Sequence, residues 1–174
     1  MLMDKKDLRI VFMGTPEFAS VCLDVLLKNE FNVVMVVAQP DKPVGRKHVI
    51  TPPPSKVRAL EAGIPVFQPD SMKTDEAYET LKAANPDLII TAAYGKLLPE
   101  RVLKLPKYEC INAHGSLLPK YRGGAPIQRS IINGDSKTGI TIMYMNEKMD
   151  EGDILYKSPL ILILMIQIQH YLRN

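Results

Sequence analysis

The first forty residues constrain the fold most, because two short apolar runs flank one helix-like segment there. The runs cover residues 8–13 and 33–38, which is the length of a buried strand. Between them, Thr15 suits a helix N-cap and Pro16 suits the first turn of a helix that reaches about Asn29. Two strands joined by a helix normally lie parallel in one sheet. The sequence therefore predicts an α/β fold with an open, mostly parallel sheet and helices on both faces.

The rest of the chain continues this alternation after one interruption. Residues 39–54 contain five prolines and Gly45, which predicts a long exposed loop in place of a helix or strand. Helices are then expected at residues 55–62, from about 74 to just before Asn85, and after Pro126, and strands at 65–67, 87–93, 108–114 and 140–145.

Three loops follow predicted strands, at Gly14, at Tyr94 to Pro99 and after His114. In open α/β sheets ligands bind beyond the carboxyl ends of the strands, so we expect these loops to share one crevice. Gly14 stands alone, without the three spaced glycines of a dinucleotide-binding turn. A nicotinamide-dependent dehydrogenase is therefore disfavoured.

An Asn, a His and an Asp form the candidate catalytic group. Asn112 and His114 are two residues apart on a predicted strand, so both side chains face the same side. Asp150 follows the strand at 140–145, and its carboxylate is placed to return beside the imidazole. An amide donor, an imidazolium and a carboxylate suit attack on an acyl carbon. Taken alone, the Asn-x-His pair and the Asp are each better explained by a structural role.

Length and residue types limit the class of protein. The chain has 174 residues, 46% of them hydrophobic, which fits one globular domain. Its two cysteines lack metal or disulfide spacing and no signal peptide is evident, so we expect a cytoplasmic protein that does not enter a membrane. His48, His114 and His170 are far apart, which predicts no metal. Cys110 lies on the same predicted strand as His114, but a buried structural role is favoured over a nucleophile.

Positive charge gathers in two segments although the net charge is only +3. Residues 41–58 hold five Lys or Arg against one Asp, and residues 116–134 hold three basic residues and no acid. A solvated surface and a site for a polyanionic substrate both explain such clusters.

Several motifs together resemble the amino-terminal domain of methionyl-tRNA formyltransferases. The resemblance covers about residues 8–159 and implies the Rossmann-like formyltransferase fold. The run from Asn112 to Pro119 with a downstream Asp-x-Gly is typical of transferases that use 10-formyltetrahydrofolate. The matching segments are residues 12–18, 39–46, 93–95, 111–129, 138–143 and 149–153.

The resemblance implies formyl transfer from 10-formyltetrahydrofolate, a donor substrate, to the amino group of methionyl initiator tRNA. Asn112 would orient the formyl oxygen, His114 would stabilise the oxyanion, and Asp150 would keep His114 charged and help remove the amine proton. The expected folate-lining residues are Tyr94, Gly95, Leu98, Ser116, Leu117, Leu118 and Pro119. Phe18 would contact the methionyl side chain, and Arg46 and Lys47 would approach the tRNA. By pattern alone, a helix-core role is favoured for Phe18, and Tyr94 is also explained as a strand-end aromatic.

The chain departs from that family after Pro159. We expect a catalytic domain at residues 1–159, incomplete at its carboxy-terminal end, and an anomalous apolar tail at residues 160–174. A frameshift or early stop near residue 160 would explain the tail and the absence of the family's carboxy-terminal tRNA-binding domain. Two alternatives stay open: a related transferase acting on an amino sugar nucleotide, and an inactive remnant that binds folate or RNA. We expect a monomer.

Overall fold

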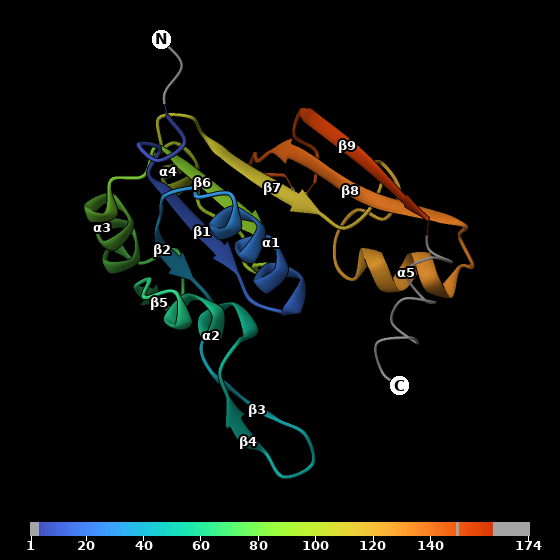
Figure 1. The fold of residues 1–174 in the computed structure, drawn as a ribbon, viewed down its shortest axis with the longest axis horizontal. Coiled ribbons are helices and arrows are strands. Elements are labelled where there is room, and N and C mark those ends of the chain that lie inside the picture. The colour runs from blue at the N-terminus through green and yellow to red at the C-terminus, as the bar shows by residue number, and fades with distance from the viewer. Residues whose placement is uncertain (1–3, 149, 162–174) are drawn as a thin grey trace. The chain divides into compact units, whose positions relative to one another are not determined.

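The computed structural model describes residues 4–148 and 150–161, and the chain forms two compact units that meet at Ile111 and Asn112. Strand β7 (Cys110–His114) passes from the first unit into the second. In hydrogen-bonding order the strands run β5-β2-β1-β6-β7-β8-β9 and form an open, mostly parallel mixed sheet (Figure 1). The predicted α/β class is confirmed.

The first unit is built on four parallel strands, β1 (Ile10–Gly14), β2 (Val33–Val37), β5 (Val66–Phe67) and β6 (Leu88–Ala92). β1 lies between β2 and β6 and pairs with β6 from Ile10 opposite Leu88 to Gly14 opposite Ala92. The side chains of residues 10–13 are fully buried because helices cover both sides of this strand. The apolar run at the start of the chain therefore forms the centre of the core.

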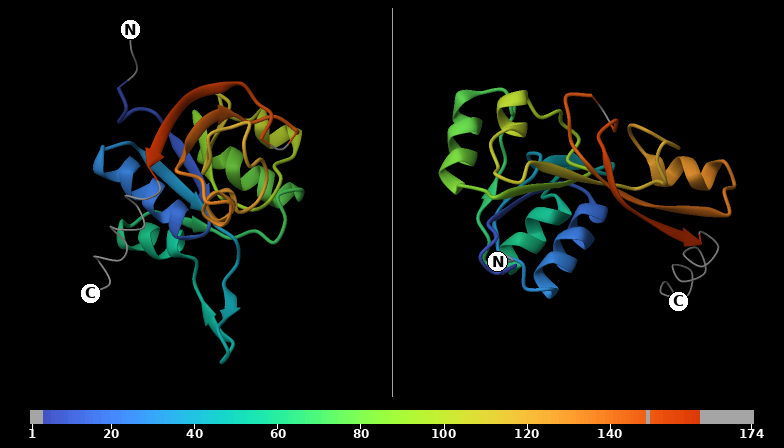
Figure 2. Two further views of the ribbon diagram at one scale, coloured as in Figure 1. Left: turned by 90° about the vertical axis from the view of Figure 1, so that its right-hand side faces the viewer. Right: turned by 90° about the horizontal axis from the view of Figure 1, so that it is seen from above.

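Helices cover both faces of these parallel strands (Figure 2). α1 (Glu17–Lys28) and α2 (Pro54–Glu61) pack together on one face, and α3 (Asp75–Ala84) and α4 (Glu100–Leu103) pack on the other. The sequence did not predict α4, whose four residues are too few to show a helical period. None of the helices in the described ranges is long and apolar enough to span a membrane.

The start of α1 corrects one expectation. Pro16, not Thr15, is the N-cap residue, and Pro16 makes no side-chain capping hydrogen bond. The Thr15 hydroxyl instead accepts a hydrogen bond from the Gln39 N–H and donates one to the Tyr94 carbonyl, both at 3.3 Å. The tertiary contacts of Thr15 thus replace the local capping role.

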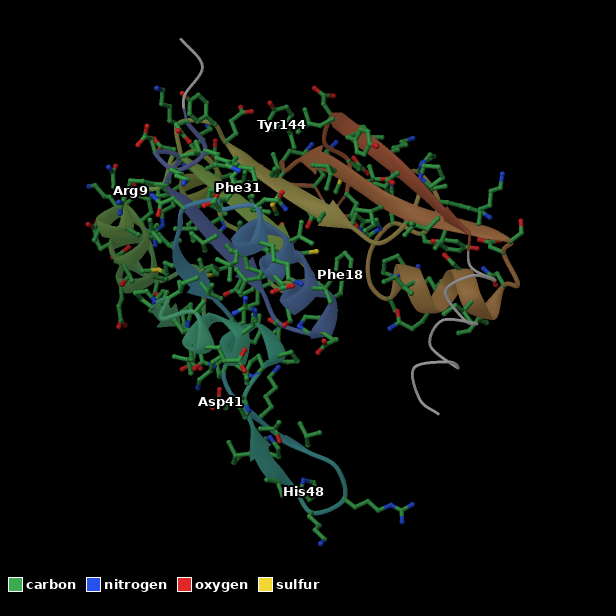
Figure 3. The ribbon with its side chains drawn as sticks, in the orientation of Figure 1. Arg9, Phe18, Phe31, Asp41, His48 and Tyr144 are labelled. Carbon is green, nitrogen blue, oxygen red and sulfur yellow. The ribbon has the colours of Figure 1, made fainter. Side chains whose placement is uncertain are left out.

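The proline-rich segment after β2 is a hairpin, which corrects the prediction of a loop without strands. β3 (Lys42–Val44) pairs antiparallel with β4 (Val49–Thr51), and Gly45 and His48 adopt positive φ in the turn. The hairpin projects from the first unit, with Asp41 at its base and His48 at its tip (Figure 3). Residues 42–51 are all exposed, as predicted, so only the hairpin ladder itself was missed.

The second unit continues β7 with α5 (Pro126–Ile132), β8 (Lys137–Tyr144) and β9 (Ile154–Ile161). β8 and β9 pair antiparallel, and Thr141 and Met143 of β8 are buried. β9 runs two residues past Pro159, where we expected the catalytic domain to end. The rest of the predicted apolar tail, residues 162–174, lies outside the described residues.

Candidate active site

The end of β7 carries two of the predicted catalytic side chains. Asn112 and His114 lie two positions apart on this strand; Asn112 is half-buried and His114 is 6% exposed. A strand places alternate side chains on one face, so both residues belong to the same side of β7. The predicted placement of Asn112 and His114 on one strand is confirmed.

The carboxylate of Asp150 lies beside the imidazole, as predicted. Its Oδ2 is 3.6 Å from Nδ1 of His114, and the side chains of Asp150 and His114 are only 10% and 7% exposed. The same oxygen accepts a hydrogen bond of 2.7 Å from the Gly123 N–H. Because water is largely excluded from both groups, a carboxylate here attracts an imidazolium more strongly than it would on an open surface.

Gly152 explains why the motif needs a glycine two residues after Asp150. A Cβ at this position would lie 1.7 Å from the Tyr144 carbonyl oxygen, at the end of β8. Only a residue without a side chain lets the backbone lie so close to the end of β8. Gly152 thus allows the tight connection between β8 and β9 that carries Asp150.

The second imidazole nitrogen has a partner that the sequence did not reveal. Nε2 of His114 lies 2.8 Å from the Tyr121 carbonyl oxygen. Because a carbonyl only accepts hydrogen bonds, Nε2 must carry a proton in this contact. No side-chain pattern reports a backbone carbonyl, so sequence reasoning had no signal for this residue.

The loop after His114 is held by internal hydrogen bonds. Ser116 is fully buried, and its hydroxyl donates to the Lys120 carbonyl at 2.6 Å. Thr141 donates to the Ser116 carbonyl at 2.7 Å and accepts from the Leu118 N–H at 3.1 Å. The Leu118–Pro119 peptide is cis. Among the residues expected to line a folate site, Ser116 and Leu118 therefore shape the loop, while Leu117 is half-buried and Pro119 is exposed.

The other predicted folate residues lie in the first unit. Tyr94 and Leu98 are 4% and 6% exposed, and Gly95 is exposed with positive φ. Burial raises the pKa of the Tyr94 phenol to about 12. Its hydroxyl is buried and has no hydrogen-bond partner among the described residues. A buried hydroxyl without a partner costs free energy, so Tyr94 is an exception among the buried polar side chains of the described residues.

The loops after β1, β2 and β6 meet at one edge, as expected for the carboxyl ends of parallel strands. Gln39 Nε2 donates to the Tyr94 carbonyl at 2.8 Å, and Thr15 contacts the same carbonyl. Gly14 is required here, since a Cβ would lie 2.6 Å from the Ala92 carbonyl oxygen. The prediction that the His114 loop shares this edge stays a prediction.

The expected substrate-binding residues are also in the first unit. Phe18 is half-buried on α1, so it is not a fully buried core residue (Figure 3). Arg46 and Lys47 are exposed in the hairpin turn, which leaves both cations open to a partner.

Cys110 is not arranged as a nucleophile. Its thiol faces the Leu103 and Val102 carbonyls at 3.6 and 3.8 Å, and burial raises its pKa to about 12. A thiol that stays protonated at neutral pH is a poor nucleophile, so the structural role expected from the sequence is supported.

The sequence matches a family of known proteins over almost the whole chain. The model of the family described as formyl transferase matches residues 8–169. The chain belongs to the formyl transferase family. The matched range includes all three residues and spans both compact units, which agrees with the resemblance seen in the sequence motifs.

Relatives with high identity carry one common name. The chain is 58% identical over 147 residues to a methionyl-tRNA formyltransferase of Macrococcus caseolyticus, which covers 84% of this chain and 47% of that protein. It is 57% identical over 149 residues to the methionyl-tRNA formyltransferase of Bacillus subtilis, with 86% and 47% coverage. The chain thus spans about half the length of the curated relatives it matches.

A solved structure supports the fold. Phosphoribosylglycinamide formyltransferase from Bacillus halodurans superposes with a TM-score of 0.71 at 23% identity, covering 93% of this chain and 88% of that one. At this identity the likeness bears on the fold alone, and it confirms the expected formyltransferase fold.

Proposed function

We propose that this formyl transferase family member transfers the formyl group of 10-formyltetrahydrofolate to the amino group of methionyl initiator tRNA, in the cytoplasm. The observation that carries the proposal is the close approach of His114 and Asp150 in a chain more than half identical to methionyl-tRNA formyltransferases. Expected partners are the tRNA and the folate, both as substrates, and no metal takes part.

The chemistry follows from the three groups on and beside β7. The amine of the methionyl group attacks the formyl carbon, and the carbonyl oxygen becomes an oxyanion. Asn112 donates an amide hydrogen bond to that oxygen, and a protonated His114 stabilises its charge. Asp150 favours the imidazolium and receives the amine proton. The bond from carbon to N10 then breaks, and N10 leaves with the proton that Asp150 received from the amine.

Different residues bind the folate, the methionyl side chain and the tRNA phosphates. Tyr94, Gly95, Leu98 and the run from Ser116 to Pro119 hold the folate. Phe18 contacts the methionyl side chain. Arg46 and Lys47 contact phosphates of the tRNA acceptor stem, since both cations project from an exposed hairpin.

The test is formyl transfer from 10-formyltetrahydrofolate to methionyl initiator tRNA by the purified 174-residue chain, with His114→Ala as the control. Transfer that the control lacks is the expected result. Transfer to an amino sugar nucleotide in place of the tRNA would favour the related transferase. Folate binding without any transfer would favour an inactive binding protein.

The tRNA contact is tested separately by the salt dependence of binding. Arg46→Ala with Lys47→Ala should lower the slope of log Kd against log salt by about one for each phosphate that the hairpin no longer neutralises. An unchanged slope would remove the hairpin from the tRNA site.

A further inference from the structure

The two ring nitrogens of His114 have different neighbours at different distances. Nε2 is within hydrogen-bond distance of the Tyr121 carbonyl, at 2.8 Å. Nδ1 is 3.6 Å from Asp150, which allows electrostatic attraction but is longer than a hydrogen bond. The carbonyl fixes a proton on Nε2, and it leaves Nδ1 as the nitrogen whose proton is available for exchange.

Tyr121 holds its carbonyl in place through its own side chain. Its hydroxyl donates to Asp135 Oδ2 at 2.7 Å and accepts from Asn133 Nδ2 at 2.9 Å. The residue has a φ of 58°, in the left-handed region that a tyrosine rarely adopts without tertiary support. The phenol contacts supply that support.

Asp135, which accepts the hydrogen bond of the Tyr121 hydroxyl, is itself held by further contacts. Asp135 lies just beyond α5, and its N–H donates to the Ser130 carbonyl at 3.0 Å. Its carboxylate also pairs with Lys120 at 2.9 Å, next to Tyr121 in the chain. The hydrogen bond from Tyr121, followed by that from Lys120, lowers the pKa of Asp135. An ionised carboxylate is the stronger acceptor for the phenol.

We propose that Tyr121, anchored through its phenol to Asp135, positions His114 so that Nε2 stays bonded to the Tyr121 carbonyl and Nδ1 is presented to Asp150 and to the reacting formyl group. Tyr121 and Asp135 are positioning residues, because they act through His114. The proposal rests on the proposed function for the identity of the reacting group. The bond to the carbonyl itself stands without it.

The arrangement assigns a role to each imidazole proton. The Nε2 proton is structural and stays on the Tyr121 carbonyl through the reaction. The Nδ1 proton is the one that the oxyanion receives as a hydrogen bond, with Asp150 stabilising the positive charge of the ring. A variant that frees the carbonyl lets the ring turn or change tautomer, so the donor is lost without loss of His114.

The first experiment reads the tautomer directly and needs no substrate. Long-range proton–nitrogen correlation spectra of the ¹⁵N-labelled chain, recorded at a pH high enough that the nitrogen shifts report a neutral ring, show which nitrogen carries the proton. His114→Ala identifies the His114 signals. We expect the Nε2–H tautomer in the unaltered chain and a mixture of both tautomers in Tyr121→Phe, with at least about a threefold fall in their ratio.

Two further variants keep the result interpretable. Asp135→Asn removes the charged acceptor and should change the ratio in the same direction, which gives an answer if Tyr121→Phe does not fold. Tyr156→Phe is the matched control, since Tyr156 is 64% exposed on β9, and it should leave the His114 signals unchanged. An Nδ1–H tautomer in the unaltered chain, or no change in either anchor variant, would overturn the proposal.

Kinetics then separate this inference from the proposed function. Tyr121→Phe should lower kcat for formyl transfer about tenfold, because small misplacements of a reacting group are costly, while KM for the tRNA stays within about twofold. If the tautomer responds as expected but the unaltered chain transfers no formyl group, the proposed function fails and the positioning of His114 stands. If transfer occurs and neither kcat nor the tautomer responds, the positioning role fails.

Discussion

Oδ2 of Asp150 lies 3.6 Å from Nδ1 of His114 and at the same time accepts the Gly123 N–H at 2.7 Å. The carboxylate is thus fixed by the backbone of one loop while it faces the imidazole of a strand. A carboxylate held in this way does not need to be reoriented during a reaction. It keeps the charge of the ring balanced without a further loss of side-chain freedom.

Replacing Asp150 by Asn, which has nearly the same shape but no charge, tests the role of the carboxylate. Asp150→Asn should lower formyl transfer about a hundredfold, because the imidazolium loses its counter-charge and the amine loses its proton acceptor. Asn suits this position because Asp150 has a φ of 54°, which Asn tolerates better than most residues. Rates from single-turnover assays give the comparison. Glu151→Gln, at the exposed neighbouring position, should retain the rate within about twofold, and an equal loss in both variants would argue against a specific role.

Asn112 is expected to act only as charge develops on the formyl oxygen. Asn112→Ala should therefore reduce kcat by about a hundred- to a thousandfold, the usual cost of one oxyanion donor. Folate affinity, measured by fluorescence titration, should change little, since the donor contributes most in the transition state. Asn146→Ala, at an exposed position before Asp150, is the control. A large loss of folate affinity in Asn112→Ala would instead indicate a ground-state binding role.

Gly152 should be intolerant of any side chain. Gly152→Ala forces a methyl group against the Tyr144 carbonyl, where a Cβ would lie at 1.7 Å. We expect the free energy of unfolding to fall by about 1–3 kcal/mol, as for overpacked sites. Urea denaturation measures the change. Gly124→Ala is a matched control, since a Cβ there meets no atom within 4 Å and its change should stay within about 0.5 kcal/mol.

The buried Cys110 thiol predicts a loss of stability in alkali. Burial raises its pKa from 9.0 to about 12, so the unfolded chain releases this proton at lower pH than the folded chain. The stability is therefore fully present below about pH 9 and falls as the pH rises toward 12. The slope from this one group reaches at most about 1.4 kcal/mol per pH unit.

The comparison that isolates this thiol is the pH dependence of urea unfolding for the unaltered chain and for Cys110→Ala. The unaltered chain should lose stability more steeply between about pH 9 and 11. Tyr94 and Cys22, whose pKa values are also raised by burial, contribute equally to both. Parallel curves would show that the Cys110 thiol ionises as readily in the folded chain as in the unfolded one.

Most of the first unit could be predicted because its signals are local. Strand β1 and helix α1 were predicted from an apolar run and from residues that favour a helix start. The start of α3 was predicted near Thr74, and the Thr74 hydroxyl indeed caps this helix by accepting the Ala77 N–H. The hairpin of β3 and β4 was missed because Pro43 lies within it and three prolines follow it, a composition that suggests a loop. Its pairing is decided by the turn at Gly45 to His48, whose geometry the composition does not specify.

In the candidate site too, some features could be predicted from local sequence and others could not. Asn112 and His114 were predicted as a pair because strand alternation is a property of the chain itself. The Asp-x-Gly motif marked Asp150, but its 3.6 Å approach to His114 is a contact between residues that are far apart in the chain. Only the folded chain sets that distance.

The sequence by itself determined the α/β class, the family and the identity of the three candidate catalytic residues, because side-chain type and spacing carry that information. Only the tertiary structure decided that Nε2 of His114 binds the Tyr121 carbonyl and that Tyr121 depends on Asp135. The physical reason is that every residue has a backbone carbonyl, so only the folded path of the chain determines which one reaches the imidazole.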